Sequence, residues 1–281
     1  MTTGRPIGAG GPEFDWSWSD EDPSWVPPDI DITKPSPARM YDYALGGKDN
    51  FEVDRKAVEQ VAQVLPDFRH LAKLNRMFLV NAVRIMAEAG VKQFIDIGTG
   101  IPTSPNVHEM AREVHPDARV VYVDNDPIVM AHNRALRATV DGVITVQHDA
   151  RQPDAIIADP KVRELIDFQQ PVGMLFVAVL HFVRRDLAAD VVARFRSAVP
   201  AGSYLAISAA CTEGMDPQVV AKTEAVYQNA AAQIVFRTAA QVEQLFEGLE
   251  VLEPGIADVS RWRVDEQTAE IHVYAGIGRK A

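Results

Sequence analysis

The sequence predicts an α/β protein built around a mostly parallel, doubly wound β-sheet, and three observations support this fold class. From residue 91 onward, short apolar segments alternate with amphipathic ones, as the strands of a parallel sheet alternate with crossover helices. The first apolar segment, 94–97, runs directly into the glycine turn Gly98-Thr99-Gly100. The segment 171–179 is apolar almost throughout, which is typical of a central strand covered on both faces.

Two helices are expected before the first strand. Apolar residues follow Asn50 at helical spacing up to residue 64, and Asn50 itself is a suitable helix cap. A second helix is expected over 67–89, because this segment has an apolar side and is followed by Gly90. Residues 39–50 combine aromatic and charged side chains with Gly46-Gly47. They form either a structured turn held by tyrosine packing or a lid that the glycines allow to move.

The remaining elements alternate regularly. Asp126 is expected to cap a helix that starts at Pro127, and Thr238 with Gln241 forms the capping box of a later helix. Strands are expected at 94–97, 118–123, 143–147, 171–179, 203–208, 249–252 and 271–277, with helices at 186–199, 216–232 and 238–246.

The chain is predicted to have three parts: a leader (1–38), an N-terminal lid with helices (39–90) and a ligand-binding domain (91–281) with a cap insert around 211–237. The leader is rich in glycine and proline, which disfavours helix and strand. The leader either wraps onto the rest of the protein or a partner, or is flexible. Tryptophans can bury large areas, which favours wrapping. The tryptophans of the leader are Trp16, Trp18 and Trp25.

Composition excludes several classes of protein. The net charge of −11 argues against a general nucleic-acid binder, which would need a basic face. No apolar run reaches the roughly 18 residues of a membrane span, and the start of the chain lacks a signal-peptide pattern. The single cysteine, Cys211, excludes an internal disulfide and fits a reducing compartment, so a cytoplasmic location without membrane partners is expected. No metal site is expected.

The glycine turn predicts a nucleotide-type cofactor. Glycines let the backbone approach a ligand closely, and open parallel sheets bind ligands at the carboxyl ends of their strands. A dinucleotide would require a third glycine where this chain has Thr103, just after Pro102, so that pattern is only partly matched. The pattern Asp96-x-Gly98-x-Gly100 instead suits S-adenosylmethionine, because a carboxylate can hold the ammonium of its methionine end.

Polar residues after the next two strands complete the predicted cofactor site. Asp124 lies 24 positions after Gly100, near the offset of about 20 residues at which an acid binds ribose hydroxyls. Asp126 is accounted for as a helix cap, whereas the sequence assigns no structural task to Asp124, and Asn125 could face the adenine. Asp149 follows the third strand and could accept from the adenine amino group. The acids after three strands would then contact the methionine, ribose and base of one ligand.

Together, Asp96-x-Gly98-x-Gly100, Asp124 and Asp149 resemble the motifs of class I S-adenosylmethionine-dependent methyltransferases over about residues 70–281, which implies a Rossmann-like fold. The block 36–55, SPARMYDYALGGKDNFEVDR, ahead of the loop FIDIGTGIPT, more specifically resembles a bacterial family named S-adenosyl methyltransferase. This resemblance favours the lid interpretation of the N-terminal block. It also implies that four residues of the block lie near the cofactor or substrate: Tyr41, Tyr43, Gly47 and Lys48.

The end of the fourth strand bears on the methyl acceptor. The chain reads FVAVLH over 176–181, without the Asp or Asn and prolines that methyltransferases of base amino groups often carry, so base methylation is disfavoured. His181 resembles a histidine that often follows this strand in small-molecule methyltransferases, although it also has a structural interpretation as a strand-end residue. The candidate general bases are His181 and Tyr41, ahead of His70 and Glu213. The predicted cofactor-binding residues are Asp96, Gly98, Thr99, Gly100, Pro102, Asp124, Asn125, Asp149, Ala150, Val177, Tyr43, Gly47 and Lys48.

The predicted function is S-adenosylmethionine-dependent methyl transfer to a small molecule, with S-adenosylhomocysteine as the product. The sulfonium is already activated, so the protein mainly has to orient the reacting groups. Two alternatives stay open. The partial dinucleotide pattern suggests an NAD(P)-dependent oxidoreductase, and the lack of an assignable base permits a non-catalytic S-adenosylmethionine-binding regulator. A homo-oligomer is compatible with the sequence.

Overall fold

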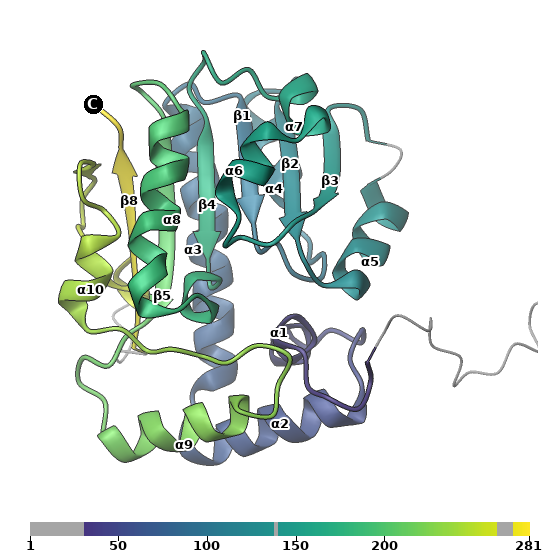
Figure 1. The fold of residues 1–281 in the computed structure, drawn as a ribbon, viewed down its shortest axis with the longest axis vertical. Helices are drawn as coiled ribbons and strands as arrows, with labels where there is room; N and C mark the ends of the chain where they lie inside the picture. Colours follow the sequence, from purple (N-terminus) through teal and green to yellow (C-terminus); the bar gives the residue numbers. More distant parts are fainter. Residues whose placement is uncertain (1–30, 138–139, 263–271) are drawn as a thin grey trace, which may run out of the picture. The chain divides into compact units, whose positions relative to one another are not determined.

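The computed structural model in Figure 1 describes residues 31–137, 140–262 and 272–281. The chain divides into two compact units, Met1–Asp31 and Ile32–Ala281, and the fold described here belongs to the second. The prediction that the tryptophan-containing leader wraps onto a surface therefore falls largely outside the described residues.

A single mixed sheet forms the centre of this unit, with strand order β3-β2-β1-β4-β5-β8-β6 and β7 paired to β8. The first five strands of that order are parallel, and β8 joins β5 in antiparallel register. This arrangement confirms the predicted Rossmann-like α/β fold. The strands are β1 (Gln93–Ile97), β2 (Arg119–Asp124), β3 (Val143–Gln147), β4 (Gly173–Val177), β5 (Tyr204–Ala210), β6 (Glu250–Val251), β7 (Ala257–Asp258) and β8 (Val273–Arg279).

Helices cover both faces of the sheet because neighbouring strand residues point to opposite sides. Phe94 of β1 packs with α3 (Phe68–Glu88) and α4 (Val107–Val114) on one face. Ile95 and Ile97 pack on the other face with the helices α6 (Pro153–Ala158), α7 (Pro160–Leu165), α8 (Arg185–Ala198) and α10 (Ala239–Gln244). The fold also contains α5 (Pro127–Arg137) and the 3₁₀ segments η2 (Leu180–Phe182) and η3 (Val259–Trp262).

Most predicted elements agree with the structure to within a few residues. The helix expected over 67–89 is α3, and the capping box of Thr238 and Gln241 is present at α10. The prediction for Asn50 is wrong: the N-cap of α2 (Glu52–Val64) is Phe51, and the amide of Asn50 instead donates to the Asp42 carboxylate at 2.8 Å. Residues 39–50 are not a turn throughout, because α1 (Pro37–Leu45) occupies most of them.

A buried ion pair ties α1 to α2. The Asp54 carboxylate accepts from Arg39 Nε at 2.7 Å, and the two side chains are 0% and 3% exposed. The same carboxylate accepts from the backbone N–H groups of Ser36 and Phe51 at 2.9 and 2.8 Å. One acid therefore satisfies backbone donors at the start of both helices, which buried groups require.

Helices α1 and α2 lie beyond the carboxyl ends of the parallel strands, together with α9 (Pro217–Tyr227) from the region after β5 (Figure 1). Met40 of α1, Val58 and Val61 of α2 and Tyr227 of α9 share a small buried apolar cluster. Segments far apart in the sequence thus form one helical layer at this edge of the sheet, which we call the cap.

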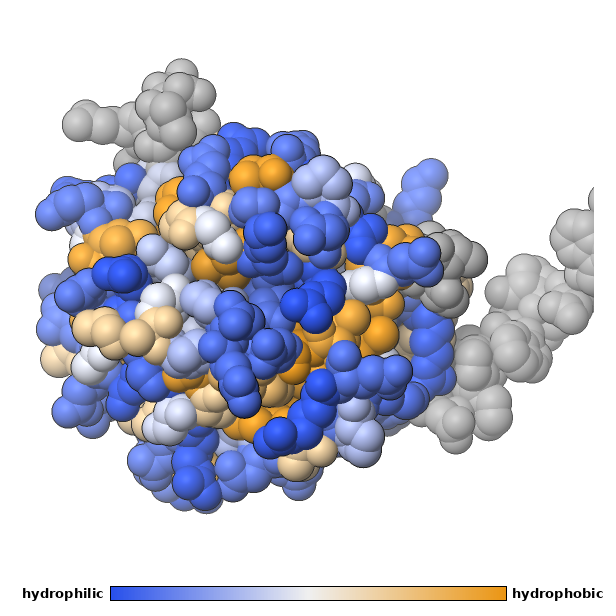
Figure 2. All heavy atoms as spheres, turned by 90° about the horizontal axis from the view of Figure 1, so that it is seen from above, coloured by the Kyte–Doolittle hydropathy of each residue, from blue (hydrophilic) through white to orange (hydrophobic). Residues whose placement is uncertain are grey.

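Figure 2 shows the side of the molecule opposite to the cap, where hydrophobic residues are interspersed among hydrophilic ones. Within residues 31–137, 140–262 and 272–281, no helix combines the length and the apolar character needed to cross a membrane.

The ion pair of Asp54 yields a test of the cap. Asp54→Asn should lower the free energy of unfolding by about 3 kcal/mol, because it leaves the Arg39 guanidinium buried without its counter-charge. Urea denaturation measures this change. Glu52→Gln, two positions away on the same helix, is the matched control. It breaks an exposed pair with Lys56 and should leave the unfolding midpoint nearly unchanged. Equal effects of the two variants would contradict this account.

Candidate active site

The glycine turn after β1 has two residues in the left-handed region, Gly98 (φ 71°) and Gly100 (φ 66°), which glycine adopts without strain. Gly98 N–H donates to Val123 O of β2 at 2.8 Å, so the turn is continuous with the sheet. A Cβ on Gly98 would lie 2.3 Å from a methyl of Val179, whereas the corresponding position on Gly100 has no atom within 4 Å. Gly98 is therefore needed for packing, and Gly100 leaves open space for a ligand.

Asp124, the last residue of β2, is bound to this turn. Its Oδ2 accepts from Gly100 N–H at 2.9 Å, and its Oδ1 accepts from Asp126 N–H at 3.0 Å. Burial raises the pKa of the Asp124 carboxyl to about 6, although these backbone hydrogen bonds oppose the shift. The sequence assigned no structural task to Asp124, and the structure corrects this point because the acid joins the β1 turn to the start of α5.

Asp126 caps α5 as expected. Its Oδ1 accepts from Ile128 N–H at 2.9 Å, and its Oδ2 accepts from the hydroxyl of Ser36 at 2.7 Å. The second bond connects the start of α1 to the turn that carries Asp124. The N-terminal block therefore docks at the predicted cofactor edge, a contact that local sequence patterns do not reveal.

The other two predicted acids lie in different surroundings. Asp96 is buried in β1, on the face of the sheet that α3 and α4 cover. Asp149 follows β3, and its carboxylate receives hydrogen bonds from the Arg151 side chain and backbone. The Arg151 guanidinium lowers the pKa of Asp149, so this acid is ionised. Because β3, β2 and β1 are adjacent parallel strands, Asp96, Asp124 and Asp149 all belong to the carboxyl half of the sheet.

The remaining cofactor candidates are distributed along the same edge. Thr99 N–H donates to Val123 O at 3.2 Å, Asn125 is exposed after β2, and Val177 is half-buried at the end of β4. Pro102 and Ala150 are also half-buried, in the loops after β1 and β3.

Gly46 and Gly47 each have a structural reason in the fold. Gly46 (φ 90°) ends α1 in a left-handed conformation, and a Cβ on Gly47 would lie 2.0 Å from an oxygen of Asp42. The Asp42 carboxylate also accepts from Asp49 N–H at 3.0 Å and from the Asn50 amide. Gly47 is thus required because the loop is tightly folded around Asp42.

The other residues of the N-terminal block have separate contacts. Tyr43 stacks under the Arg69 guanidinium, whose Cζ lies 4.4 Å from the ring centroid, and Lys48 is exposed. Tyr41 is half-buried, and its hydroxyl donates to Ala72 O at 3.0 Å and accepts from the Asn75 amide at 3.0 Å. Burial raises the pKa of Tyr41, so its hydroxyl keeps its proton.

The contacts of His181 argue against the predicted role as a general base. Its Nδ1 accepts from Ala210 N–H at 3.4 Å, and burial lowers the pKa of the ring to about 3. The lone pair that would take a proton is therefore already engaged in a buried backbone contact. Tyr41 is unsuitable for the related reason that its proton is held by Ala72 O. His70 and Glu213 are exposed.

Sequence reasoning missed three residues near this edge, namely Asn75 and Arg76 of α3 and Ser208 of β5. Arg76 Nη2 donates to Pro105 O at 2.6 Å and also to Thr103 O, so it holds the segment that follows the glycine turn. Asn75 and Ser208 are almost fully buried. A polar residue inside the apolar stretch of β5, or on the apolar side of α3, was the signal that could have identified them.

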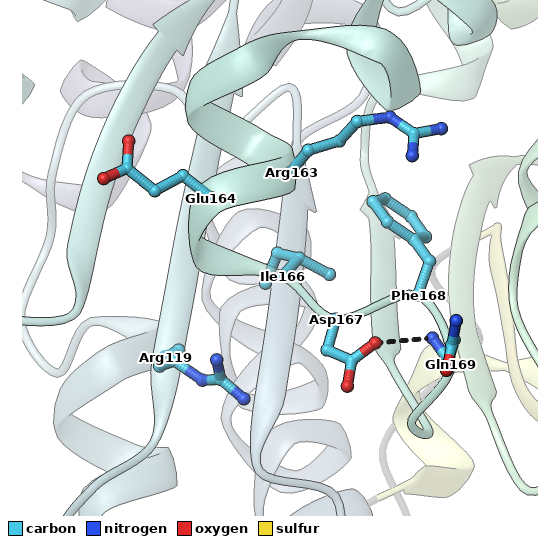
Figure 3. Close-up of a pocket in the computed structure, with 7 residues that line it drawn as sticks. All are labelled: Arg119, Arg163, Glu164, Ile166, Asp167, Phe168 and Gln169. Carbon is cyan, nitrogen blue, oxygen red and sulfur yellow. Dashed lines mark hydrogen bonds between the residues drawn. The ribbon is translucent and has the colours of Figure 1, made fainter.

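One pocket lies at the opposite, amino edge of the sheet (Figure 3). Its volume is about 280 Å³, and it is lined by Arg119, Arg163, Glu164, Ile166, Asp167, Phe168 and Gln169. The polar groups there serve the local chain: Arg119 donates to Leu165 O at 2.9 Å, and Asp167 accepts from Gln169 N–H at 2.9 Å. Arg163 and Glu164 point away from each other, so they do not converge on a ligand (Figure 3).

The strand order β3-β2-β1-β4-β5-β8-β6, with β8 antiparallel beside β5, is typical of class I methyltransferases. The chain belongs to the S-adenosyl methyltransferase family, because the model of that family matches residues 23–281. It is therefore an S-adenosylmethionine-dependent methyltransferase. The oxidoreductase and non-catalytic alternatives are not retained.

Solved structures agree with this assignment. A putative methyltransferase from Thermobifida fusca YX is 40% identical, with a TM-score of 0.85, and the match covers 92% of this chain and 99% of that one. A DUF574 family protein from Streptomyces avermitilis MA-4680 is 39% identical, with a TM-score of 0.84, covering 89% and 99% of the two chains. No curated protein sequence matches the chain.

The two glycines of the turn should respond differently to alanine. Gly100→Ala places a side chain in open space and should lower the free energy of unfolding only by the left-handed strain, about 1–2 kcal/mol. Gly98→Ala adds the clash with Val179 and should be destabilising by about 1–3 kcal/mol more. Thermal or urea unfolding of the ligand-free variants measures both. A larger loss for Gly100→Ala would contradict the packing described for Gly98.

Proposed function

We propose that this enzyme methylates a small molecule and that its cofactor lies across the glycine turn, at the carboxyl ends of β1 to β4. The observation that carries the proposal is the cap: α1, α2 and α9 lie over this edge and share the buried cluster of Met40, Val58, Val61 and Tyr227. A layer of helices packed over the reacting edge restricts the approach of a large acceptor. The net charge of −11 also disfavours nucleic acid.

The residues of the turn fit S-adenosylmethionine. Open space at Gly100 admits the ligand beside the backbone. The Asp124 carboxylate, held in place by backbone N–H groups, would accept the two ribose hydroxyls. Asp96 would take the ammonium of the methionine end, and Asp149 and Asn125, which follow the neighbouring strands β3 and β2, would take the adenine.

Arg76 adds a cation that the sequence did not predict for this site. Its Nη2 is bonded to the loop after the glycine turn, while its Nε is buried and has no hydrogen-bond partner among the described residues. Buried donors without partners are rare in folded proteins. Arg76 is therefore proposed to bind the carboxylate of the methionine end, while Asp96 binds its ammonium.

The chemistry requires positioning more than proton transfer. The cofactor supplies an activated methyl group, so the protein has to hold the acceptor in line with the bond that breaks. The His181 ring and the Tyr41 hydroxyl are both engaged in hydrogen bonds with the backbone. The half-buried apolar residues Val177 and Val179 at the end of β4 would form a wall that keeps water from the reacting groups.

The acceptor class can be tested with methyl-labelled S-adenosylmethionine and a bacterial extract separated by size. We expect label in the small-molecule fraction with the wild type and none with Asp124→Ala. Label confined to protein, RNA or DNA would overturn the small-molecule proposal while leaving methyl transfer intact. Calorimetry with S-adenosylhomocysteine should show binding by the wild type and severe weakening in Asp124→Ala.

Asp124 also predicts a pH dependence. The ionised carboxylate accepts ribose hydroxyls, so affinity for S-adenosylhomocysteine should fall about tenfold per pH unit below pH 6, the region of the raised pKa. Stability should respond in the opposite direction. The folded pKa of about 6 lies above the ordinary value of 3.8. The free energy of unfolding of the ligand-free protein should therefore fall by about 3 kcal/mol as pH rises from 3.8 to about 6.

Calorimetry and urea unfolding between pH 4 and 8 measure the two effects. Asp124→Asn has no titrating group at this position and should lose both dependences. Identical pH profiles for the wild type and Asp124→Asn would refute the assignment of Asp124.

A further inference from the structure

A chain of hydrogen bonds crosses the interior from the end of β4 to the N-terminal block. Ala178 N–H, just after β4, donates to Ser208 Oγ of β5 at 2.9 Å. The Ser208 hydroxyl donates to Asn75 Oδ1 of α3 at 2.6 Å. Ser208 and Asn75 are 0% and 1% exposed. These are buried polar groups in a mainly apolar interior, and each finds its partner in another element.

The chain continues into α1. The Asn75 amide donates from Nδ2 to Tyr41 Oη at 3.0 Å, and the Tyr41 hydroxyl donates to Ala72 O at 3.0 Å. Each side chain between the two backbone ends accepts one hydrogen bond and donates one, so all the bonds run in the same direction. Hydrogen bonds in such a chain polarise and strengthen one another in a buried environment.

The β4 end of the chain is a strained turn. Ala178 has φ 58°, a left-handed conformation that is unfavourable for residues other than glycine. Such conformations persist where surrounding contacts enforce them, and the bond to Ser208 is one such contact. The following residue, Val179, packs directly against Gly98 of the glycine turn. The conformation of Ala178 therefore decides where Val179 lies against that turn.

We propose that Tyr41, Asn75 and Ser208 are positioning residues that hold the β4 turn in its cofactor-binding shape, so that tight cofactor binding depends on the seating of α1. This inference rests on the proposed cofactor site at the carboxyl edge. Tyr41 acts on the cofactor only through Asn75, Ser208 and the backbone at Ala178. The chain couples the N-terminal block to the cofactor through the protein interior, without requiring a moving lid.

The structure contains a matched control for Ser208. Ser203, immediately before β5, is also fully buried, and its Oγ accepts from Val172 N–H at 3.1 Å. It makes the same kind of backbone contact between β4 and β5, but at the amino edge of the sheet. Ser203→Ala and Ser208→Ala should therefore both lower the unfolding midpoint. Only Ser208→Ala should weaken S-adenosylhomocysteine binding, by about tenfold in calorimetry, the size expected for one lost buried hydrogen bond.

A double-mutant cycle tests the connection to α1. Tyr41→Phe should weaken S-adenosylhomocysteine binding in the wild-type background but add little in the Ser208→Ala background, because the chain is already broken. Tyr204→Phe, at the amino end of β5, is the control for removal of a tyrosine hydroxyl and should leave affinity unchanged. If Ser208→Ala does not fold, the comparison of Tyr41→Phe with Tyr204→Phe still decides the question.

Three results would overturn the inference: equal affinities for Ser203→Ala and Ser208→Ala, additive effects of Tyr41→Phe and Ser208→Ala, or equal affinities for the two tyrosine variants. In each case the wild type would still bind S-adenosylhomocysteine and Asp124→Ala would still not, so the proposed site would stand. Failure of the wild type to bind would instead remove the proposed site and the inference together.

Discussion

The carboxylate of Asp124 is the contact on which the carboxyl edge of the sheet depends. One oxygen accepts from Gly100 N–H and the other from Asp126 N–H, so the turn after β1 and the start of α5 share a single buried acid. Burial disfavours the ionised form and raises the pKa of this carboxyl to about 6. The chain thus keeps a group that reduces stability near neutral pH, at the edge where we propose that the cofactor binds.

The N-terminal block is organised by two further carboxylates. Asp54 accepts hydrogen bonds from backbone donors at the start of α1 and α2, and Asp42 accepts one from the backbone of the loop that follows α1. Ser36 then joins this block to Asp126, next to Asp124. Asp54 is buried, whereas the hydrogen bonds of Asp42 and Ser36 are partly buried, and that of Ser36 joins segments 90 positions apart.

The hydrogen bonds of His181 and Tyr41 disfavour both residues as catalytic bases. His181 is buried and Tyr41 is half-buried, and their hydrogen bonds connect elements of the fold. Transfer of an activated methyl group does not require a base when the acceptor is already nucleophilic. The side chains at this edge then serve to bind, orient and exclude water.

The sequence by itself was enough for the fold class, the positions of most strands and the family. Those features depend on local patterns: alternating apolar segments, the glycine turn after β1 and the helix cap formed by Asp126. It also indicated Asp124, because an acid at a fixed offset from a glycine turn is a local pattern too. Asn50 was misassigned as a helix cap because its true partner, Asp42, lies on the preceding helix.

Only the tertiary structure could reveal the partners of buried polar groups. Ser208 and Asn75 are 133 positions apart in the chain, and nothing in either neighbourhood indicates that their side chains meet. Likewise, the requirement for glycine at position 98 comes from Val179, which belongs to another strand end. Local spacing determines which elements form, whereas the packing of distant elements decides which polar side chains face one another.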